Sequence, residues 1–313
     1  MMDPRMLTLL GVVTIALIAG SAIGELMRFT ARSDRGRAFG DNLRSRMLSW
    51  WIMAAIFIIS ILIGGTTTVI LFALSSFLAF REFITLSATR RGDHRALFWA
   101  FFVIIPLQYI FVARANHEMF TILIPVFAFL MIPARIAAAG DTGEFVGRMS
   151  RIQWGLMVCV YFVSHVPALL TLEIAGYDGS NAILLFFFIL IVQMNDVMQY
   201  VVGSLIGRTP IAPTVSPNKT VEGMIGGVVS SAAIGAALAW ATPFSVIPAA
   251  CLAMAIAWMG FLGDIKMSAV KRDIGVKDYA ATLPGHGGVL DRLDSLTFAA
   301  PLFFHVVRYF YVM

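Results

Sequence analysis

Long apolar runs, separated by short polar segments, dominate the pattern of side chains along this sequence. Gly64 and Gly65, followed by the threonines at 66–68, separate the second run from the third and predict a tight helical hairpin. Because about 20 apolar residues cross a bilayer as a helix, each run predicts a membrane-spanning segment. We therefore expect an all-α fold, a polytopic integral membrane bundle of about nine to ten transmembrane helices. The runs cover residues 6–27, 47–65, 66–86, 96–113, 119–134, 154–174, 182–206, 223–241, 245–263 and 295–313.

Basic residues are distributed unevenly between these runs. Arg32, Arg91 and Arg148 belong to the segments after the first, third and fifth runs, and the segments after the seventh and ninth runs are also basic. The intervening segments contain little basic charge beyond Arg114. By the positive-inside rule, ten spans would place the basic segments in the cytoplasm and both termini outside; a re-entrant run would leave nine spans. Because positive charge follows the first run rather than preceding it, we expect an anchor and not a signal peptide.

The composition agrees with this pattern. Hydrophobic residues make up 59% of the 313 positions and charged residues 13%, against about 25% charged in soluble domains. Cys159 and Cys251 lie inside apolar runs, which predicts packing roles. No basic patch interleaved with aromatic residues indicates a nucleic-acid partner. We expect a single membrane domain over 1–313, with N-terminal helices at 1–150 and a catalytic half at 151–313.

Asp196 lies near the end of the seventh run, and Tyr200, Gly203 and Gly207 follow it at helical spacing on the same face. An ionisable residue within a membrane span is costly, so its presence indicates function. The alternative is an ion pair with an arginine on a neighbouring helix.

The segment between the seventh and eighth runs combines hydroxyl, amide and ammonium groups before a glycine-rich helix. Helix N-termini favour anions, so a Pro-ordered loop here predicts a phosphate cradle. The alternative is an ordinary capped turn in which Thr220 is the N-cap. The residues concerned are Ser216, Asn218, Lys219, Thr220 and Glu222.

The segment from Asp264 to Asp294 contains five acidic and five basic residues beside two apolar runs. Asp264, Ser268 and Lys271 are spaced to share one helical face. The segment continues through a Pro-Gly-His-Gly-Gly sequence, where missing side chains let backbone amides approach a ligand. Carboxylates suit Mg²⁺ bridged to phosphates, and basic side chains suit phosphate oxygens. The alternative is a solvated loop of ion pairs.

Read together, these positions resemble the signature of the phosphatidate cytidylyltransferases, also called CDP-diacylglycerol synthases. The resemblance covers residues 190–313, including the Ser216–Thr220 segment and Asp196 with Tyr200; earlier, only the spans match, with Glu82 as a further candidate. The signature positions in the charged segment are Ser268, Lys271, Arg272, Lys277, Asp278, Pro284, Gly285, His286, Gly287, Gly288, Asp291, Arg292 and Asp294.

This resemblance implies transfer of a cytidylyl group from CTP to phosphatidic acid at the cytoplasmic face of a bacterial inner membrane. It also implies one or two Mg²⁺ ions held by Asp264, Asp291 and Asp196. The resemblance gives catalytic roles to Asp264, Asp291, Lys271, Arg272 and Asp196. It gives substrate contacts to Ser216, Asn218, Lys219, Thr220, Glu222, Ser268, Lys277, Asp278, His286, Gly287, Arg292 and Asp294.

One departure concerns the residues between Asp196 and Tyr200. The family usually has a pattern like Asp-Thr-Gly-Ala-Tyr, whereas this chain has Val197, Met198 and Gln199. A related nucleotidyl- or phosphotransferase acting on another lipid phosphate therefore remains an alternative. A transporter with Asp196 in its ion path is a third hypothesis, although no internal repeat favours it. The sequence leaves the oligomeric state open, and a homodimer is among the states it allows.

Overall fold

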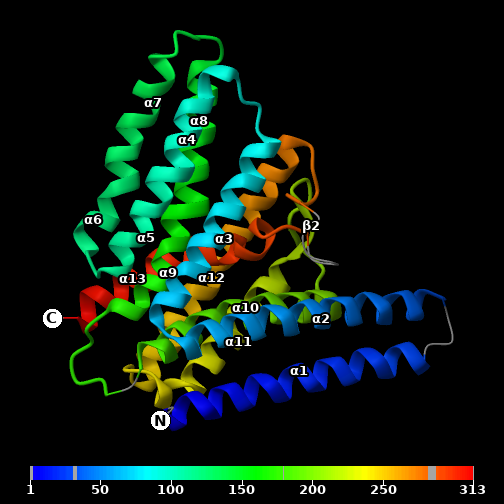
Figure 1. Cartoon of the computed structure of the whole chain (residues 1–313). Helices are drawn as coiled ribbons and strands as arrows, with labels where there is room; N and C mark the ends of the chain where they lie inside the picture. The colour runs from blue at the N-terminus through cyan, green and yellow to red at the C-terminus, as the bar shows by residue number, and fades with distance from the viewer. Residues whose placement is uncertain (1–2, 31–33, 179, 281–286, 313) are drawn as a thin grey trace.

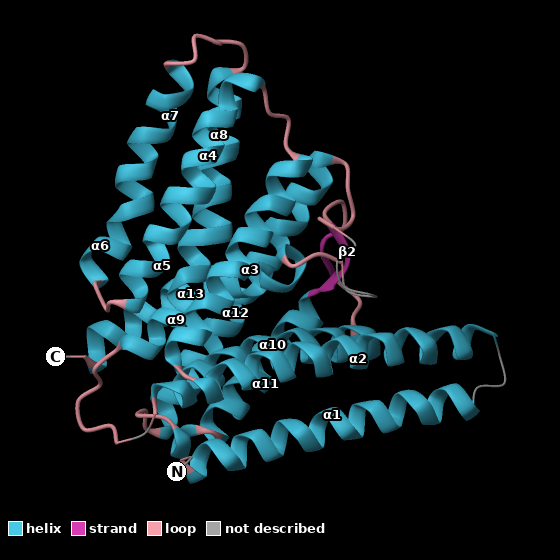
Figure 2. Ribbon diagram, in the orientation of Figure 1, coloured by secondary structure: helices cyan, strands magenta, loops and turns pink. Residues whose placement is uncertain are grey.

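Helices account for nearly all of the structure, a computed structural model that describes residues 3–30, 34–178, 180–280 and 287–312 (Figures 1 and 2). This confirms the predicted all-α class. The N-terminal elements are α1 (Pro4–Thr30), α2 (Asp34–Ile63), α3 (Gly65–Leu86), η1 (Arg91–Asp93), α4 (His94–Trp99), η2 (Ala100–Ile104), α5 (Ile105–Ala113), α6 (His117–Ile122), η3 (Leu123–Ala128) and α7 (Phe129–Ala137). The remaining elements are α8 (Phe145–Leu156), η4 (Met157–Phe162), α9 (Val163–Ala168), η5 (Leu169–Thr171), α10 (Asn181–Ile206), β1 (Pro210–Ala212), β2 (Ser216–Thr220), α11 (Val221–Ala237), η6 (Ala239–Ala241), α12 (Val246–Ile274) and α13 (Leu290–Tyr311).

The ten apolar runs lie mostly in helices or in consecutive helical elements, and the chain is a polytopic integral membrane protein. Within the described ranges, seven segments are long and apolar enough to cross a membrane. The runs at 47–65 and 223–241 form the shorter apolar helices Met47–Ile63 and Val221–Ala237. The seven segments are Pro4–Leu26, Gly65–Leu86, Arg91–Ala113, His117–Ala137, Phe145–Thr171, Asn181–Ile206 and Val246–Ile274.

The predicted hairpin between the second and third runs is confirmed. Helix α2 ends at Ile63 and α3 begins at Gly65, with Gly64 alone between them at a φ of 140°. Side chains other than hydrogen are strained at this φ, so glycine is required here. Helix α2 also packs along α1 (Figure 1). Between these two helices, the Trp51 indole donates to the Ser21 hydroxyl at 3.1 Å.

The last predicted span, α13, lies at the centre of the bundle rather than at its lipid surface. It packs against α12, α9, α10 and α3. Phe303 and Phe304 on α13 are fully buried, and the Phe303 ring stacks on Phe188 of α10 at 5.4 Å between ring centroids. This central position fixes the start of α13, where Asp291 and Asp294 lie, against the helices around it.

Both chain ends lie against the segment that precedes α10. The Arg5 guanidinium pairs with Asp178 at 3.1 Å, and the Ala175 amide donates to the Tyr311 carbonyl at 3.3 Å. The two described ends of the chain therefore lie close to this one segment.

The segments after the third and fifth runs come together through a buried ion pair. Arg148, at the start of α8, is 1% exposed and lies 3.0 Å from an oxygen of Asp93, which is fully buried. Its guanidinium also donates to the Gly143 carbonyl at 2.6 Å. Arg148 follows the fifth run as the sequence indicates, but it is an internal cross-link and not a solvated loop charge.

Glycines let α10 and α11 approach closely beneath the site. A Cβ on Gly227 would lie 2.5 Å from Cγ of Gln199 and 2.7 Å from Oδ1 of Asn195. Small residues at such positions allow membrane helices to pack backbone to backbone. The polar side chains of this part of α10 therefore lie directly against α11.

Candidate active site

The Ser216–Thr220 segment forms a strand instead of the expected loop. Strand β2 pairs antiparallel with β1, with Pro210 opposite Thr220 and Ala212 opposite Ser216. The physical reason is that backbone groups between two membrane helices still need hydrogen-bond partners, which the hairpin supplies. The predicted N-cap is confirmed, since the Thr220 hydroxyl accepts from the Gly223 amide at 3.2 Å.

Glu222, a predicted substrate contact, is used within this hairpin. Its carboxylate accepts hydrogen bonds from the Arg208 amide at 3.0 Å, the Thr209 amide at 3.2 Å and the Thr209 hydroxyl at 2.9 Å. These contacts tie the end of α10 to the start of α11. The described geometry therefore gives Glu222 an anchoring role for β1 and β2.

Lys219 is the centre of the first polar cluster. Its ammonium pairs with Oδ2 of Asp264 on α12 and donates to Oε1 of Gln199 on α10 at 3.1 Å. The Phe261 ring lies 5.7 Å from the ammonium. Burial lowers the pKa of Lys219, but the carboxylates of Asp264 and Asp196 raise it more, so the pKa is above its ordinary value and the side chain stays charged.

Two further carboxylates border this cluster. Oδ2 of Asp196 accepts from the Ser295 hydroxyl at 3.0 Å, whereas Oδ1 is buried and has no hydrogen-bond partner among the described residues. Asp294, one residue before Ser295 on α13, is repelled by the charges of Asp264 and Asp196 and attracted by Arg292. The three acidic residues come from α10, α12 and α13, so only the folded bundle brings them together.

Asp291 forms the second polar cluster. Its Oδ1 accepts from the Lys271 ammonium at 2.9 Å, and its Oδ2 accepts from the amides of Tyr279 and Gly288, each at 2.9 Å. Asp291 is 3% exposed. Both carboxylate oxygens are thus occupied, and they hold the described parts of the loop after α12 against the start of α13.

The predicted helical face links the two clusters. The Ser268 hydroxyl donates to Oδ1 of Asp264 at 3.3 Å, one turn before Lys271 reaches Asp291. Arg272 turns toward the hairpin instead, where its Nε donates to the Val215 carbonyl at 3.2 Å.

Other predicted site residues lie around the clusters. Lys277 and Asp278 are exposed, as is Asn218, while Ser216 is half-buried. The Nε of Arg292 is buried and has no hydrogen-bond partner within the described ranges. His286 lies outside the described residues, as do Pro284 and Gly285.

The glycines after His286 lie close to two protein carboxylates, and the expected approach to a ligand stays a prediction. Gly287 has a φ of 77°, and a Cβ there would lie 2.8 Å from Oδ2 of Asp291. A Cβ on Gly288 would lie 2.4 Å from Oε2 of Glu82. Glu82, on α3, accepts from the Val289 amide at 3.0 Å and the Leu290 amide at 2.9 Å. It therefore satisfies the free amides at the start of α13.

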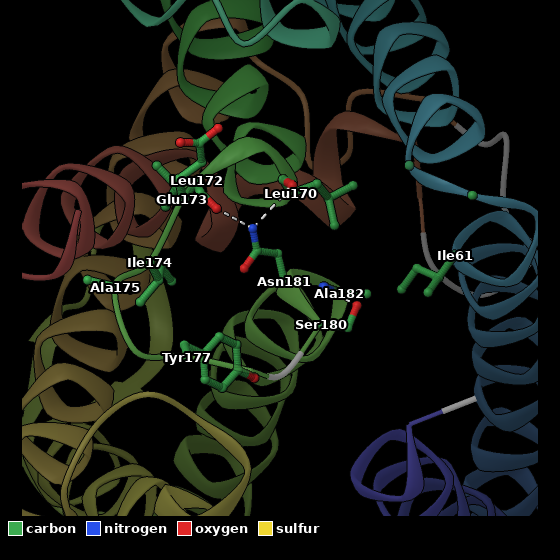
Figure 3. Close-up of a pocket in the computed structure, with 12 residues that line it drawn as sticks. Ile61, Leu170, Leu172, Glu173, Ile174, Ala175, Tyr177, Ser180, Asn181 and Ala182 are labelled. Atoms are coloured by element: carbon green, nitrogen blue, oxygen red, sulfur yellow. Dashed lines mark hydrogen bonds between the residues drawn. The ribbon is translucent and has the colours of Figure 1, made fainter. Parts of the chain in front are cut away.

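Two cavities lie at opposite ends of α10. The smaller, about 130 Å³, is lined by Asp196, Lys219, Ser216, Asn218 and others from α10, β2 and α11. The larger, about 760 Å³, lies at the start of α10, where Asn181 donates to the carbonyls of Leu170 and Leu172 and Tyr177 faces the opening (Figure 3). About 22 Å of helix separate Asn181 from Asp196, so the larger cavity is remote from the polar clusters.

Comparison with known proteins supplies the family. The sequence matches the model of the "Cytidylyltransferase family" over residues 44–310. The chain belongs to the cytidylyltransferase family. It is therefore an enzyme, a nucleotidyltransferase. The match begins well before residue 190, whereas the sequence motifs of the resemblance all lie after it.

Relatives of this cytidylyltransferase cover most of its length. It is 40% identical to the "Uncharacterized protein YnbB" of Escherichia coli K12 over 86% of this chain and 89% of the relative. It is 29% identical to the phosphatidate cytidylyltransferase of Staphylococcus haemolyticus, over 83% and 97%. It is 27% identical to the phosphatidate cytidylyltransferase of Bacillus subtilis, over 86% and 99%.

The structure adds polar partners to this cytidylyltransferase site that the motifs did not single out. Ser295 bonds Asp196 and lies one helical turn after Asp291, so helical spacing alone offered a weak signal for it. Tyr279 is buried in the charged segment and donates its amide to Asp291, for which the sequence contains no signal.

Proposed function

We propose that this enzyme transfers the cytidylyl group of CTP to phosphatidic acid, giving CDP-diacylglycerol and pyrophosphate, at the cytoplasmic face of a bacterial inner membrane. The observation that carries the proposal is the Lys219 cluster, where a half-buried ammonium lies with Asp196 and Asp264 beside two membrane-spanning helices. The relatives from Staphylococcus haemolyticus and Bacillus subtilis are named phosphatidate cytidylyltransferases, which supports it.

In the proposed reaction, an oxygen of the lipid phosphate attacks the α-phosphorus of CTP. A new P–O bond forms, the bond between the α-phosphorus and its bridging oxygen breaks, and pyrophosphate leaves with the bonding electrons. Such a transfer needs positioning and charge neutralisation, not a covalent protein nucleophile. Lys219 and Arg292 would neutralise phosphate oxygens near Asp196, and Lys271 and Arg272 would do so farther along α12.

The residues fit a divalent cation in part. Asp196 has a buried oxygen without a partner, and Asp264 is held beside it by Lys219 and Ser268. In the described part of the chain, no group of three or more acidic, histidine or cysteine side chains is already gathered as a metal site. Asp196 and Asp264 would hold Mg²⁺, and Asp291 would join them only by releasing Lys271 or its backbone donors. When bound, Mg²⁺ would withdraw charge from phosphate oxygens.

The proposal is tested by incorporation of radiolabelled CTP into organic-extractable product, with purified protein and phosphatidic acid in detergent micelles. We expect activity that EDTA abolishes and Mg²⁺ restores. The variant Asp264→Asn should lose at least about a hundredfold in rate, as expected when a group that organises transition-state charge is removed. The matched control is Asp273→Asn, an exposed carboxylate at the end of α12. Full activity of Asp264→Asn would contradict the site assignment.

The alternative, a transferase for another lipid phosphate, draws on a specific observation. Gln199, the departure next to Tyr200, is in direct contact with Lys219. A panel of lipid phosphates decides between the two readings: product with an isoprenoid phosphate but not with phosphatidic acid would favour the alternative.

A further inference from the structure

The side-chain amide of Gln199 has a hydrogen-bond partner for its oxygen but none, among the described residues, for its nitrogen. The residue lies on α10 and is 5% exposed. Its Oε1 accepts from the Lys219 ammonium at 3.1 Å. Because an ammonium has donors only, this contact fixes which end of the amide faces Lys219. The Nε2 is buried and has no hydrogen-bond partner among the described residues.

A buried donor of this kind costs free energy unless a bound molecule supplies an acceptor. Gln199 lines the cavity of about 130 Å³ that also contains Asp196, Ser216 and Lys219. Lys219 uses its ammonium on Gln199 and Asp264, and an ammonium has three donors, so one remains for a ligand. The cavity therefore offers an amide and an ammonium donor side by side, which suits an anionic oxygen.

The size and surroundings of the cavity favour a lipid head group over a nucleotide. Sites for drug-sized ligands begin at about 300 Å³, well above this volume, whereas a single phosphate is much smaller. Exposed apolar side chains lie on α10 and α11 one position along the chain from residues that line the cavity, at Val197, Val201 and Ile225. In a membrane, acyl chains can lie along such a surface while the phosphate reaches the polar cluster.

We propose that Gln199 is a substrate-binding residue for the lipid acceptor, and that its amide donates a hydrogen bond to an oxygen of a lipid phosphate seated beside Lys219. This rests on the proposed function and names the part of the substrate that the residue contacts. Gln199 also occupies the position where the family resemblance leads one to expect a small side chain, so the contact is a feature of this chain's own sequence.

Two variants separate ligand binding from support of Lys219. Gln199→Glu keeps the volume and an acceptor for Lys219 but removes the N–H donor, whereas Gln199→Ala removes both. The control is Leu205→Ala, an exposed apolar residue near the end of α10. With CTP saturating, we expect both Gln199 variants to raise the KM for phosphatidic acid by about tenfold or more, the effect of losing a hydrogen bond to a charged group. The KM for CTP in both Gln199 variants, and both KM values in Leu205→Ala, should stay within about twofold of wild type.

Wild-type kinetics in Gln199→Glu would overturn the inference, because the residue would then serve only to hold Lys219. A raised KM for CTP with an unchanged KM for the lipid would overturn it as well. Binding without turnover gives an independent measurement: phosphatidic acid in micelles should raise the Tm of the wild type, and Gln199→Glu should abolish this shift. Inorganic phosphate and phosphatidylcholine are the comparison ligands, and an equal shift with free phosphate would contradict recognition of a lipid head group.

The two proposals fail in different ways. If no lipid phosphate is turned over by the wild type, the proposed function is wrong, while the Tm shift still reports on Gln199. If the wild type is active and Gln199→Glu binds and converts the lipid normally, only the role of Gln199 is wrong.

Discussion

Replacing Asp291 by asparagine should destabilise the fold as well as lower activity. The carboxylate is 3% exposed and accepts from Lys271, Tyr279 and Gly288, each at 2.9 Å. An asparagine offers one acceptor oxygen and points its N–H₂ group at the remaining donors. Either the Lys271 ammonium or the two backbone amides must therefore lose their partner.

The magnitude follows from these contacts. An unsatisfied buried donor costs about 1–3 kcal/mol, and breaking a buried ion pair by removing one charge costs about 3–5 kcal/mol. Because Lys271 is 13% exposed and keeps some contact with water, we expect a loss near the lower limit, about 3 kcal/mol. At roughly 2 °C for each kcal/mol in a chain of this size, the Tm should fall by about 6 °C.

The assay is thermal unfolding of the detergent-purified protein, followed by tryptophan fluorescence at fixed protein and lipid concentrations. Asp273→Asn is the control, since it changes the same charge at an exposed position near the end of α12. Asp264→Asn should lower the Tm less than Asp291→Asn, because the Asp264 side chain is 21% exposed. An unchanged Tm for Asp291→Asn would refute the structural role derived from its three hydrogen bonds.

Three further predictions use the same unfolding measurement. Glu82→Gln should lower stability by about 1 kcal/mol through the loss of charge at the start of α13, and a stability equal to that of wild type would contradict this capping role. Gly227→Ala should cost about 1–3 kcal/mol because its Cβ would press on Gln199. The control is Gly11→Ala, in helix α1 with open space around it, which should be neutral or stabilise by up to about 1 kcal/mol. Arg148→Met should cost about 3–5 kcal/mol because it removes the charged partner of buried Asp93, which keeps only the Arg90 amide. Arg151→Met, with its exposed side chain, should change stability little.

The spacing of residues along the chain was enough to predict the class of fold and much of the site. Apolar length predicts helices because every backbone group in a bilayer needs an internal partner, and each of the ten runs is helical over most of its length. Local spacing likewise predicted the Asp264–Ser268–Lys271 face and the Thr220 cap, since these contacts join residues within one or two helical turns.

Contacts between distant segments could be decided only by the tertiary structure. Glu82 reaches the start of α13 across 207 positions of sequence, and Ser295 reaches Asp196 across 99. The family resemblance also implied that Asp291 is a metal ligand. In the structure, both its carboxylate oxygens accept hydrogen bonds from protein N–H groups. The environment of a carboxylate is set by which helices meet around it, and that depends on side-chain packing over the whole bundle.

Composition and periodicity act locally along the chain, so they were enough to predict a helical membrane protein with a polar segment suited to phosphate. The tertiary structure decided that α13 is central, that β2 is a strand and that Gln199 touches Lys219. Many pairings of polar side chains are compatible with the local pattern. Which of them form depends on which helices pack closely, and glycines such as Gly227 allow that packing.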